Sequence, residues 1–162
     1  MLDRYELLRL IEHNARLTQP ELAVMLGVSE EEVAAELESL HSDDIILGYT
    51  TVVNWEKTTR ESVTALIEVK LMPQRDQGFD KIAQHLYRYP QVTSCYLMSG
   101  GFDIMLIIED STLREVASFI SNKVAPIDGV VSTATHFILK KYKSNGVIFD
   151  ARPVDRREAI IL

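Results

Sequence analysis

Apolar residues recur at helical spacing in three short stretches within the first fifty residues. The first stretch spans residues 3–14, the second runs from about residue 18 to residue 27, and the third begins at residue 29. Apolar positions three or four apart are typical of an amphipathic helix. The pattern therefore predicts three short helices, with apolar positions at Tyr5, Leu7, Leu8 and Ile11; at Leu22, Ala23 and Leu26; and at Val33, Leu37 and Leu40.

Two capping boxes and one glycine mark the turn between the second and third helices. Thr18 stands three residues before Glu21, and Ser29 stands three residues before Glu32. In such a box the hydroxyl and the carboxylate each accept a hydrogen bond from a backbone N–H of the first helical turn. Gly27 suits the left-handed conformation that ends a helix. Three short helices with this turn predict a helix-turn-helix.

The rest of the chain alternates between strand-like and helical patterns. Residues 45–54 are rich in β-branched side chains and predict a connecting strand, which is followed by a polar linker. Further strands are predicted at residues 63–71, 92–98, 102–109 and 130–141, and helices at residues 78–89 and after residue 112. The order predicts an α+β protein: a three-helix winged helix-turn-helix followed by a ferredoxin-like β-α-β-β-α-β domain.

One predicted strand, residues 102–108, is apolar on both sides. In a sheet with helices on one face only, such a strand indicates that a second copy of the chain covers the other face. The alternative is a central strand that is buried within one chain.

The composition excludes several classes of protein but does not indicate any particular catalytic chemistry. The 162 residues are 46% hydrophobic, and no apolar run approaches the roughly 18 residues of a membrane helix. Residues 1–6 lack the basic and then apolar pattern of a signal segment. Cys95 is the only cysteine, so we expect no disulfide within the chain and no cysteine cluster for a metal. We expect a cytoplasmic protein that needs no cofactor or metal and does not contact a membrane.

Negative charge is concentrated in the predicted helix-turn-helix. Residues 1–50 carry eleven acidic and three basic side chains, a net −8, whereas the other 112 residues carry a net +1. Acidic residues at the start of the third helix favour it through the helix dipole, but DNA phosphates repel them. Attraction to DNA would then come from Arg16, Lys57 and Arg60, or from many units acting together.

The order of motifs resembles the Lrp/AsnC family of transcriptional regulators over residues 3–142. The residues that carry the resemblance are Asn14-Ala15-Arg16, Glu21-Leu22-Ala23, Leu26-Gly27-Val28-Ser29, Val33, Leu40, Ile46, Gly48-Tyr49, Ser99-Gly100-Gly101-Phe102-Asp103 and Ser132-Thr133-Ala134-Thr135. The second half of the third helix departs from the family, because Glu36, Glu38 and Ser39 stand where basic residues are usual.

The resemblance implies a homodimer that assembles further, for example to a tetramer of dimers, and that binds double-stranded DNA through paired recognition helices. It implies four segments: a helix-turn-helix domain with its connecting strand (1–54), a linker (55–61), a ligand-sensing and oligomerisation domain (62–143) and a C-terminal tail (144–162). The candidate DNA-contacting residues are Arg16, Thr18, Gln19, Ser29, Glu31, Glu32, Ala35, Glu36 and Ser39.

The resemblance also implies an amino acid or related metabolite as effector, bound by the C-terminal domain. The candidate effector-binding residues are Ser99, Gly100, Gly101, Phe102, Asp103, Thr133 and Thr135. Backbone N–H groups of the glycine turn would hold the carboxylate, and Asp103 would accept from the ammonium group. The alternative is that the glycines only shape a hairpin and Asp103 hydrogen-bonds the turn.

Two other functions compete with this interpretation. One is a ligand-sensing oligomer whose acidic N-terminal unit binds a protein rather than DNA. The other is an enzyme similar to the siroheme decarboxylases, which share this architecture. That enzyme would need histidine and arginine around a large cavity, whereas the four histidines are scattered along the chain, and we predict no catalytic residue.

Overall fold

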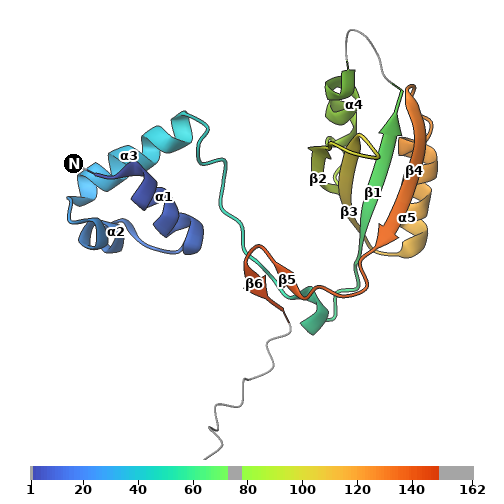
Figure 1. Cartoon of the computed structure of the whole chain (residues 1–162). Coiled ribbons are helices and arrows are strands. Elements are labelled where there is room, and N and C mark those ends of the chain that lie inside the picture. The colour runs from blue at the N-terminus through green and yellow to red at the C-terminus, as the bar shows by residue number, and fades with distance from the viewer. Residues whose placement is uncertain (1, 73–77, 150–162) are drawn as a thin grey trace, which may run out of the picture. The chain divides into compact units, whose positions relative to one another are not determined.

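Three helices form the first part of the structure, a computed structural model that describes residues 2–72 and 78–149. The described residues divide after Val52 into two compact units. The helices of the first unit are α1 (Arg4–His13), α2 (Gln19–Leu26) and α3 (Glu30–Ser42) (Figure 1). They pack around Leu7, Leu22, Val33 and Leu40, each at most 1% exposed.

The caps of α2 and α3 are those that the sequence predicts. The Thr18 hydroxyl accepts from the Glu21 backbone N–H, and the Glu21 carboxylate accepts from the Thr18 N–H at 2.8 Å. Ser29 and Glu32 repeat this arrangement at the start of α3. Gly27 ends α2 with φ +66°, in the left-handed region. The three predicted helices and the turn are therefore confirmed.

The strand predicted over residues 45–54 is not formed. Residues 46–54 have no regular secondary structure, and no described strand pairs with them. Ile46 is buried in the three-helix core, whereas Leu47 is 86% exposed. The β-branched side chains satisfy the local preference for a strand, but a strand also needs a partner to supply the ladder hydrogen bonds.

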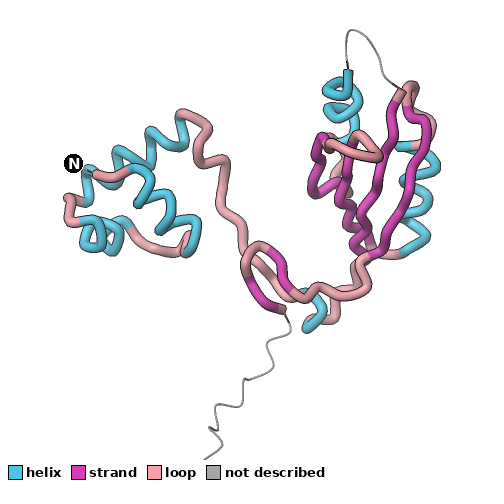
Figure 2. The backbone as a smooth tube through the Cα atoms, in the orientation of Figure 1, coloured by secondary structure: helices cyan, strands magenta, loops and turns pink. Residues whose placement is uncertain are grey.

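The second unit is built on a four-stranded antiparallel sheet. A short 3₁₀ turn, η1 (Trp55–Lys57), precedes it. The strands are β1 (Val63–Leu71), β2 (Val92–Leu97), β3 (Ile104–Asp110) and β4 (Val130–Phe137), in the order β2-β3-β1-β4 (Figure 2). This order is that of the predicted ferredoxin-like fold, which is confirmed.

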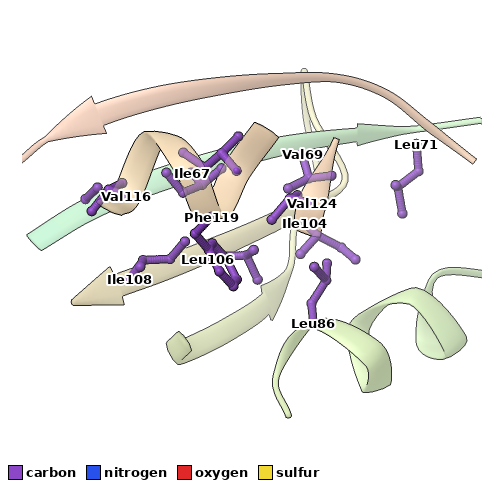
Figure 3. Close-up of a cluster of buried hydrophobic side chains, with 12 residues drawn as sticks. Ile67, Val69, Leu71, Leu86, Ile104, Leu106, Ile108, Val116, Phe119 and Val124 are labelled. Carbon is purple, nitrogen blue, oxygen red and sulfur yellow. The ribbon is translucent and has the colours of Figure 1, made fainter. Parts of the chain in front are cut away.

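Both helices of the second unit cover the same face of its sheet. They are α4 (Gly78–Leu86) and α5 (Leu113–Phe119), and α5 runs into a π-helical turn, η2 (Ile120–Val124). Leu86 from α4 and Val116 from α5 meet the inward side chains of β1 and β3, such as Ile67 and Leu106 (Figure 3). All four of these side chains are fully buried.

Among the described residues of the second unit, no helix lies on the other face of the sheet. Strand alternation and the register place Leu66 of β1 with Met105 and Ile107 of β3 on this face, where all three are half-buried. Glu68 lies on the same face, and its Oε1 is 3.2 Å from His136 Nε2 of β4. β3 therefore carries apolar side chains on both faces of the sheet, as the sequence predicts.

Several element bounds and the predicted tail differ from the sequence prediction. The strand predicted at residues 92–98 ends at Leu97, and the strand predicted at residues 102–109 spans Ile104–Asp110. α4 ends at Leu86 rather than residue 89, and β4 ends at Phe137 rather than residue 141. The predicted boundary between domain and tail, after residue 143, falls inside a hairpin of β5 (Lys143–Ser144) and β6 (Val147–Ile148). Asn145 (φ +46°) and Gly146 (φ +78°) form its turn. An Asn-Gly pair is the strongest short-range signal for a hairpin, and our interpretation missed it. Residues 150–162 of the predicted tail lie outside the described residues.

Candidate functional site

The candidate DNA-contacting residues lie before α2 and along α3. Arg16, Thr18 and Gln19 are exposed at the entrance to α2. Among the described residues, no side chain pairs with the Arg16 guanidinium, so it can meet a phosphate. The α3 candidates divide by burial: Ser29, Glu31, Glu32 and Ala35 are exposed, whereas Glu36 and Ser39 are half-buried.

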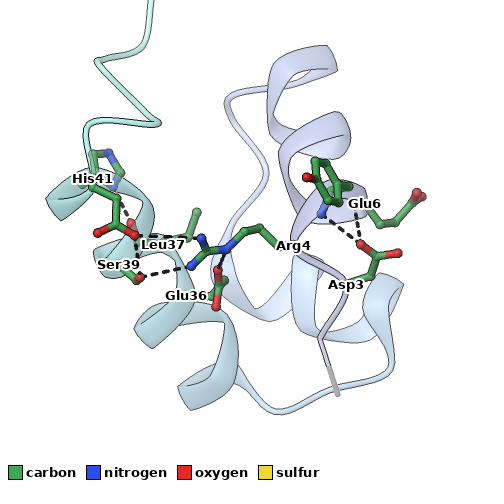
Figure 4. A network of polar contacts seen from close by, with 9 residues as sticks. Asp3, Arg4, Glu6, Glu36, Leu37, Ser39 and His41 are labelled. Atoms are coloured by element: carbon green, nitrogen blue, oxygen red, sulfur yellow. Dashed lines mark hydrogen bonds and ion pairs between the residues drawn. The ribbon is translucent and has the colours of Figure 1, made fainter.

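Arg4 of α1 engages the second half of α3 (Figure 4). Its Nε donates to Glu36 Oε1, and its Nη2 donates to Ser39 Oγ at 3.2 Å. Its Nη1 lies 3.9 Å from Asp43 Oδ2. The Glu36 side chain is only 24% exposed. Glu36 therefore joins two helices of the unit, and Arg4 balances its charge. A position where the resemblance leads us to expect a basic residue is here part of the packing between α1 and α3.

The acids at the start of α3 act on the helix itself. Glu32 caps the Ser29 backbone N–H at 3.2 Å. Hydrogen bonds from its own backbone N–H and from the Ser29 hydroxyl lower the pKa of Glu31. These carboxylates complement the positive end of the helix dipole. Toward DNA they can only accept, for example from the N4 amino group of cytosine.

The glycine turn of the second unit connects β2 and β3, and Asp103 ends it. The Met98 N–H donates to the Asp103 carbonyl at 2.8 Å, and the Asp103 N–H donates to the Val69 carbonyl at 3.0 Å. Asp103 Oδ2 accepts from the Leu71 N–H at 2.7 Å. Asp103, which precedes β3, thus forms hydrogen bonds with the end of β1 and with the residue that follows β2. The sequence predicts a hydrogen bond within the turn but not the bonds to β1.

The same turn keeps hydrogen-bonding capacity for a ligand. Within the described residues, no hydrogen bond uses the backbone N–H groups of Ser99, Gly100, Gly101 and Phe102, and Asp103 Oδ1 accepts none. Gly100 has φ +141°, a backbone conformation that side-chain-bearing residues rarely adopt. The turn therefore keeps four backbone donors and one carboxylate oxygen that have no hydrogen-bond partner among the described residues.

The structure does not bring Thr133 and Thr135 to this turn. In the sheet, Thr133 pairs with Val69 and Thr135 pairs with Ile67, and β1 separates both threonines from β3. Neighbouring strands lie about 4.8 Å apart, so the threonines are about 10 Å from β3. The main-chain groups of one amino acid cannot span that distance within a single chain.

Other kinds of site receive no support from the described part of the chain. Among residues 2–72 and 78–149, no group of three or more His, Cys, Asp or Glu side chains is placed to hold a metal ion. No described helix has the length and apolar character needed to cross a membrane. Burial raises the pKa of the Cys95 thiol, which makes this cysteine a poor nucleophile.

Comparison with known proteins addresses both units. A family model described as the Lrp/AsnC ligand binding domain matches residues 64–148. The HTH-type transcriptional regulator YugG of Bacillus subtilis is 40% identical over 153 residues, which cover 94% of this chain and 92% of YugG. The HTH-type transcriptional regulator LrpA of Pyrococcus horikoshii is 32% identical over 85% of this chain and 94% of LrpA. These relatives are transcriptional regulators rather than enzymes.

Solved structures share the fold. A transcriptional regulator of Neisseria meningitidis, crystallised with L-Met, superposes with a TM-score of 0.72 at 23% identity and covers 89% of this chain and 94% of its own. AsnC of E. coli superposes with a TM-score of 0.68, also at 23% identity, over 89% of this chain and 96% of its own. The helix-turn-helix, the ferredoxin-like sheet and the relatives together establish that the chain belongs to the Lrp/AsnC family of transcriptional regulators.

Proposed function

We propose that this protein is a cytoplasmic, DNA-binding transcriptional regulator whose DNA binding or assembly responds to an amino acid or related small metabolite. The observation that carries the proposal is a capped helix-turn-helix followed, in the same chain, by the ligand-binding domain of this family. Each unit supplies one half of the function.

The DNA-binding surface combines the start of α2 with the first turns of α3. Arg16 supplies the charge that phosphates attract, and Thr18 and Gln19 supply hydroxyl and amide groups for phosphate or sugar contacts. Glu31 and Ala35, exposed on α3, would face the bases. Only one basic residue, Arg16, belongs to the proposed DNA-binding surface of each chain, so we expect weak affinity per chain and binding that depends on several chains acting together.

Association of several copies of the chain would bring several helix-turn-helix units together. The helix-free face of the sheet carries half-buried Leu66, Met105 and Ile107, and a second copy would cover them. A two-fold dimer would present two recognition helices, which DNA accepts at a spacing of about 34 Å, one helical turn. Further pairing to a tetramer of dimers multiplies the contacts and offsets the acidic surface of α3.

The effector would bind at the turn of residues 99–103. Its carboxylate would accept from the free N–H groups of the turn, and its ammonium group would donate to Asp103 Oδ1. Thr133 and Thr135 lie too far from Asp103 within one chain, so we assign the two polar ends of the effector to the turn alone.

Binding to DNA tests the proposal directly. Fluorescence anisotropy with DNA from upstream of the protein's own coding sequence should show an affinity that falls steeply as salt rises. Arg16→Gln should weaken binding and reduce the slope of log affinity against log salt by about 1. Arg88→Gln, which removes an exposed arginine from the second unit, is the matched control. Negligible binding at the lowest salt would overturn the proposal in favour of a protein partner.

The effector site has a separate test. Asp103→Asn keeps an oxygen that can accept from Leu71 but removes the negative charge, whereas Asp128→Asn removes an exposed charge outside the turn. Loss of a hydrogen bond to a charged group should weaken binding of the preferred L-amino acid about 10-fold or more in calorimetry. Equal affinity in the two variants would refute the assignment to the turn.

A further inference from the structure

A cleft in the second unit lies between the connecting segment and the chain that follows β4. One wall is formed within residues 53–64 and the other within residues 138–149. Its volume is about 380 Å³, within the range of roughly 300–1,000 Å³ that is typical of small-molecule pockets. No residue of the turn at 99–103 lines it.

The cleft and the turn lie at opposite ends of β1. Val63, the first residue of β1, lines the cleft, whereas Leu71, its last residue, donates to Asp103. Eight steps along a strand correspond to about 26 Å. The two places therefore cannot bind the same small molecule.

Two cations line the cleft from opposite walls. Arg60 lies 4.6 Å above the Trp55 ring centroid, and its Nη2 is 3.9 Å from Glu109 Oε1. These contacts orient the guanidinium, yet within the described residues no hydrogen bond uses its N–H groups. Lys141, on the other wall, is half-buried, and no described carboxylate pairs with it. A half-buried, unpaired ammonium group that lines the same cleft as an oriented guanidinium favours an anion.

The rest of the lining is apolar on one side and hydroxylic on the other. Ile138, Leu139 and Phe149 supply the apolar side, and Ser62 and Ser111 supply hydroxyl groups. Glu56 and Glu61 also line the cleft, but both are exposed, so water solvates their charges. Arg60 is exposed as well, so burial distinguishes only the Lys141 ammonium group as a charge that water solvates poorly.

We propose that this cleft is a second ligand site, which takes a small organic carboxylate with an apolar body. The carboxylate would bind between Arg60 and Lys141, and the apolar body would pack on Leu139 and Phe149. An amino group on the ligand is not required, which separates this site chemically from the effector site at the turn.

The chain carries its own reporter for this test, because Trp55 is its only tryptophan and lines the cleft. We would titrate the full chain with 4-methylpentanoate, and with 3-methylbutylamine as the matched amine. We expect a saturable change in tryptophan fluorescence and a calorimetric isotherm with the acid, and neither with the amine. No saturable signal with the acid up to 10 mM (an order-of-magnitude limit for a specific weak site), or equal signals with both compounds, would overturn the proposal.

Variants locate the site. Arg60→Gln and Lys141→Gln should each weaken 4-methylpentanoate binding about 10-fold by calorimetry, because each removes a charge-assisted contact. Arg88→Gln, which removes an exposed charge elsewhere, should leave it unchanged. Asp103→Asn should also leave it unchanged, so failure at the turn and failure at the cleft are distinguishable. Loss of binding in Asp103→Asn, with retention in Arg60→Gln, would place the carboxylate at the turn and refute the cleft.

Discussion

Arg4 is the residue that most changes how the acidic third helix should be understood. It binds Glu36 and Ser39, so one of the acids expected to face DNA instead holds α1 against α3. We expect Arg4→Gln and Glu36→Gln each to lower the free energy of unfolding by about 0.5–1 kcal/mol, because the pair is only partly exposed. The double variant should lose less than the sum of the two.

Chemical unfolding followed by circular dichroism measures the free energy of unfolding of the wild type, the two single variants and the double variant, which together form a double-mutant cycle. The matched control is the exposed pair of Arg9 and Glu6, whose charged atoms are 3.5 Å apart within one helix. The interaction energy between Arg9 and Glu6, which is the non-additive part of the free energies of unfolding, should stay below about 0.5 kcal/mol. Additive losses for Arg4 and Glu36 would show that the two side chains do not interact in solution.

The capping box of α2 predicts a dependence on pH. Hydrogen bonds from the Thr18 backbone N–H and hydroxyl lower the pKa of Glu21 below its ordinary value of 4.5. A lowered pKa stabilises the fold above the ordinary pKa, and this contribution disappears as the pH falls through the folded-state value. The melting-temperature difference between wild type and Glu21→Ala should therefore be present at pH 7 and shrink below pH 4.5. Glu12→Ala, outside any capping box, should show no such trend, and a constant difference for Glu21→Ala would contradict this account.

At the scale of elements, predictions succeeded where local signals and burial agree. The boxes at Thr18 and Ser29 place helix starts to the residue, because the capping hydrogen bonds are local. The alternating pattern of β1 gave its bounds, because one of its faces is buried. Residues 45–54 failed because a strand depends on a partner that the pattern cannot reveal.

The site was less predictable than the fold for the same reason. The turn at 99–103 is visible as a Gly-Gly pair, but the bond from Leu71 to Asp103 joins residues 32 apart in sequence. The distance of Thr133 from Asp103 depends on strand order, which separates β4 from β3. Arg60 and Lys141 line the same cleft but lie on segments far apart in sequence, so no local sequence pattern predicts that they share a site.

The hairpin after β4 gives a test at the element scale. Gly146 has φ +78°, which a β-branched residue adopts only with strain. Gly146→Val should cost about 1–2 kcal/mol locally and abolish the contacts of Lys143 with Ile148 in nuclear magnetic resonance spectra. The four-stranded sheet should keep its chemical shifts. Ser144→Ala, in the same hairpin, is the control, and an intact hairpin in Gly146→Val would show that the turn does not need its glycine.

At the scale of the whole molecule, the helix-free face of the sheet should hold two copies together. Ile107 lies on this face and is half-buried within one chain. Ile107→Glu would bury an unpaired charge in the interface, at a cost of several kcal/mol. Light scattering after gel filtration should therefore report monomers, whereas Gln84→Glu, on an exposed position of α4, should leave the oligomer intact. Unchanged oligomers in Ile107→Glu would place the subunit contact elsewhere.

The central claim is that a small molecule held by the second unit controls how the first unit binds DNA. The most direct measurement is the affinity for the upstream DNA, by fluorescence anisotropy at fixed low salt, with and without each L-amino acid. We expect at least one amino acid to change the affinity in wild type and to lose that effect in Asp103→Asn. DNA binding that no amino acid alters, or an effect that Asp103→Asn retains in full, would contradict the account.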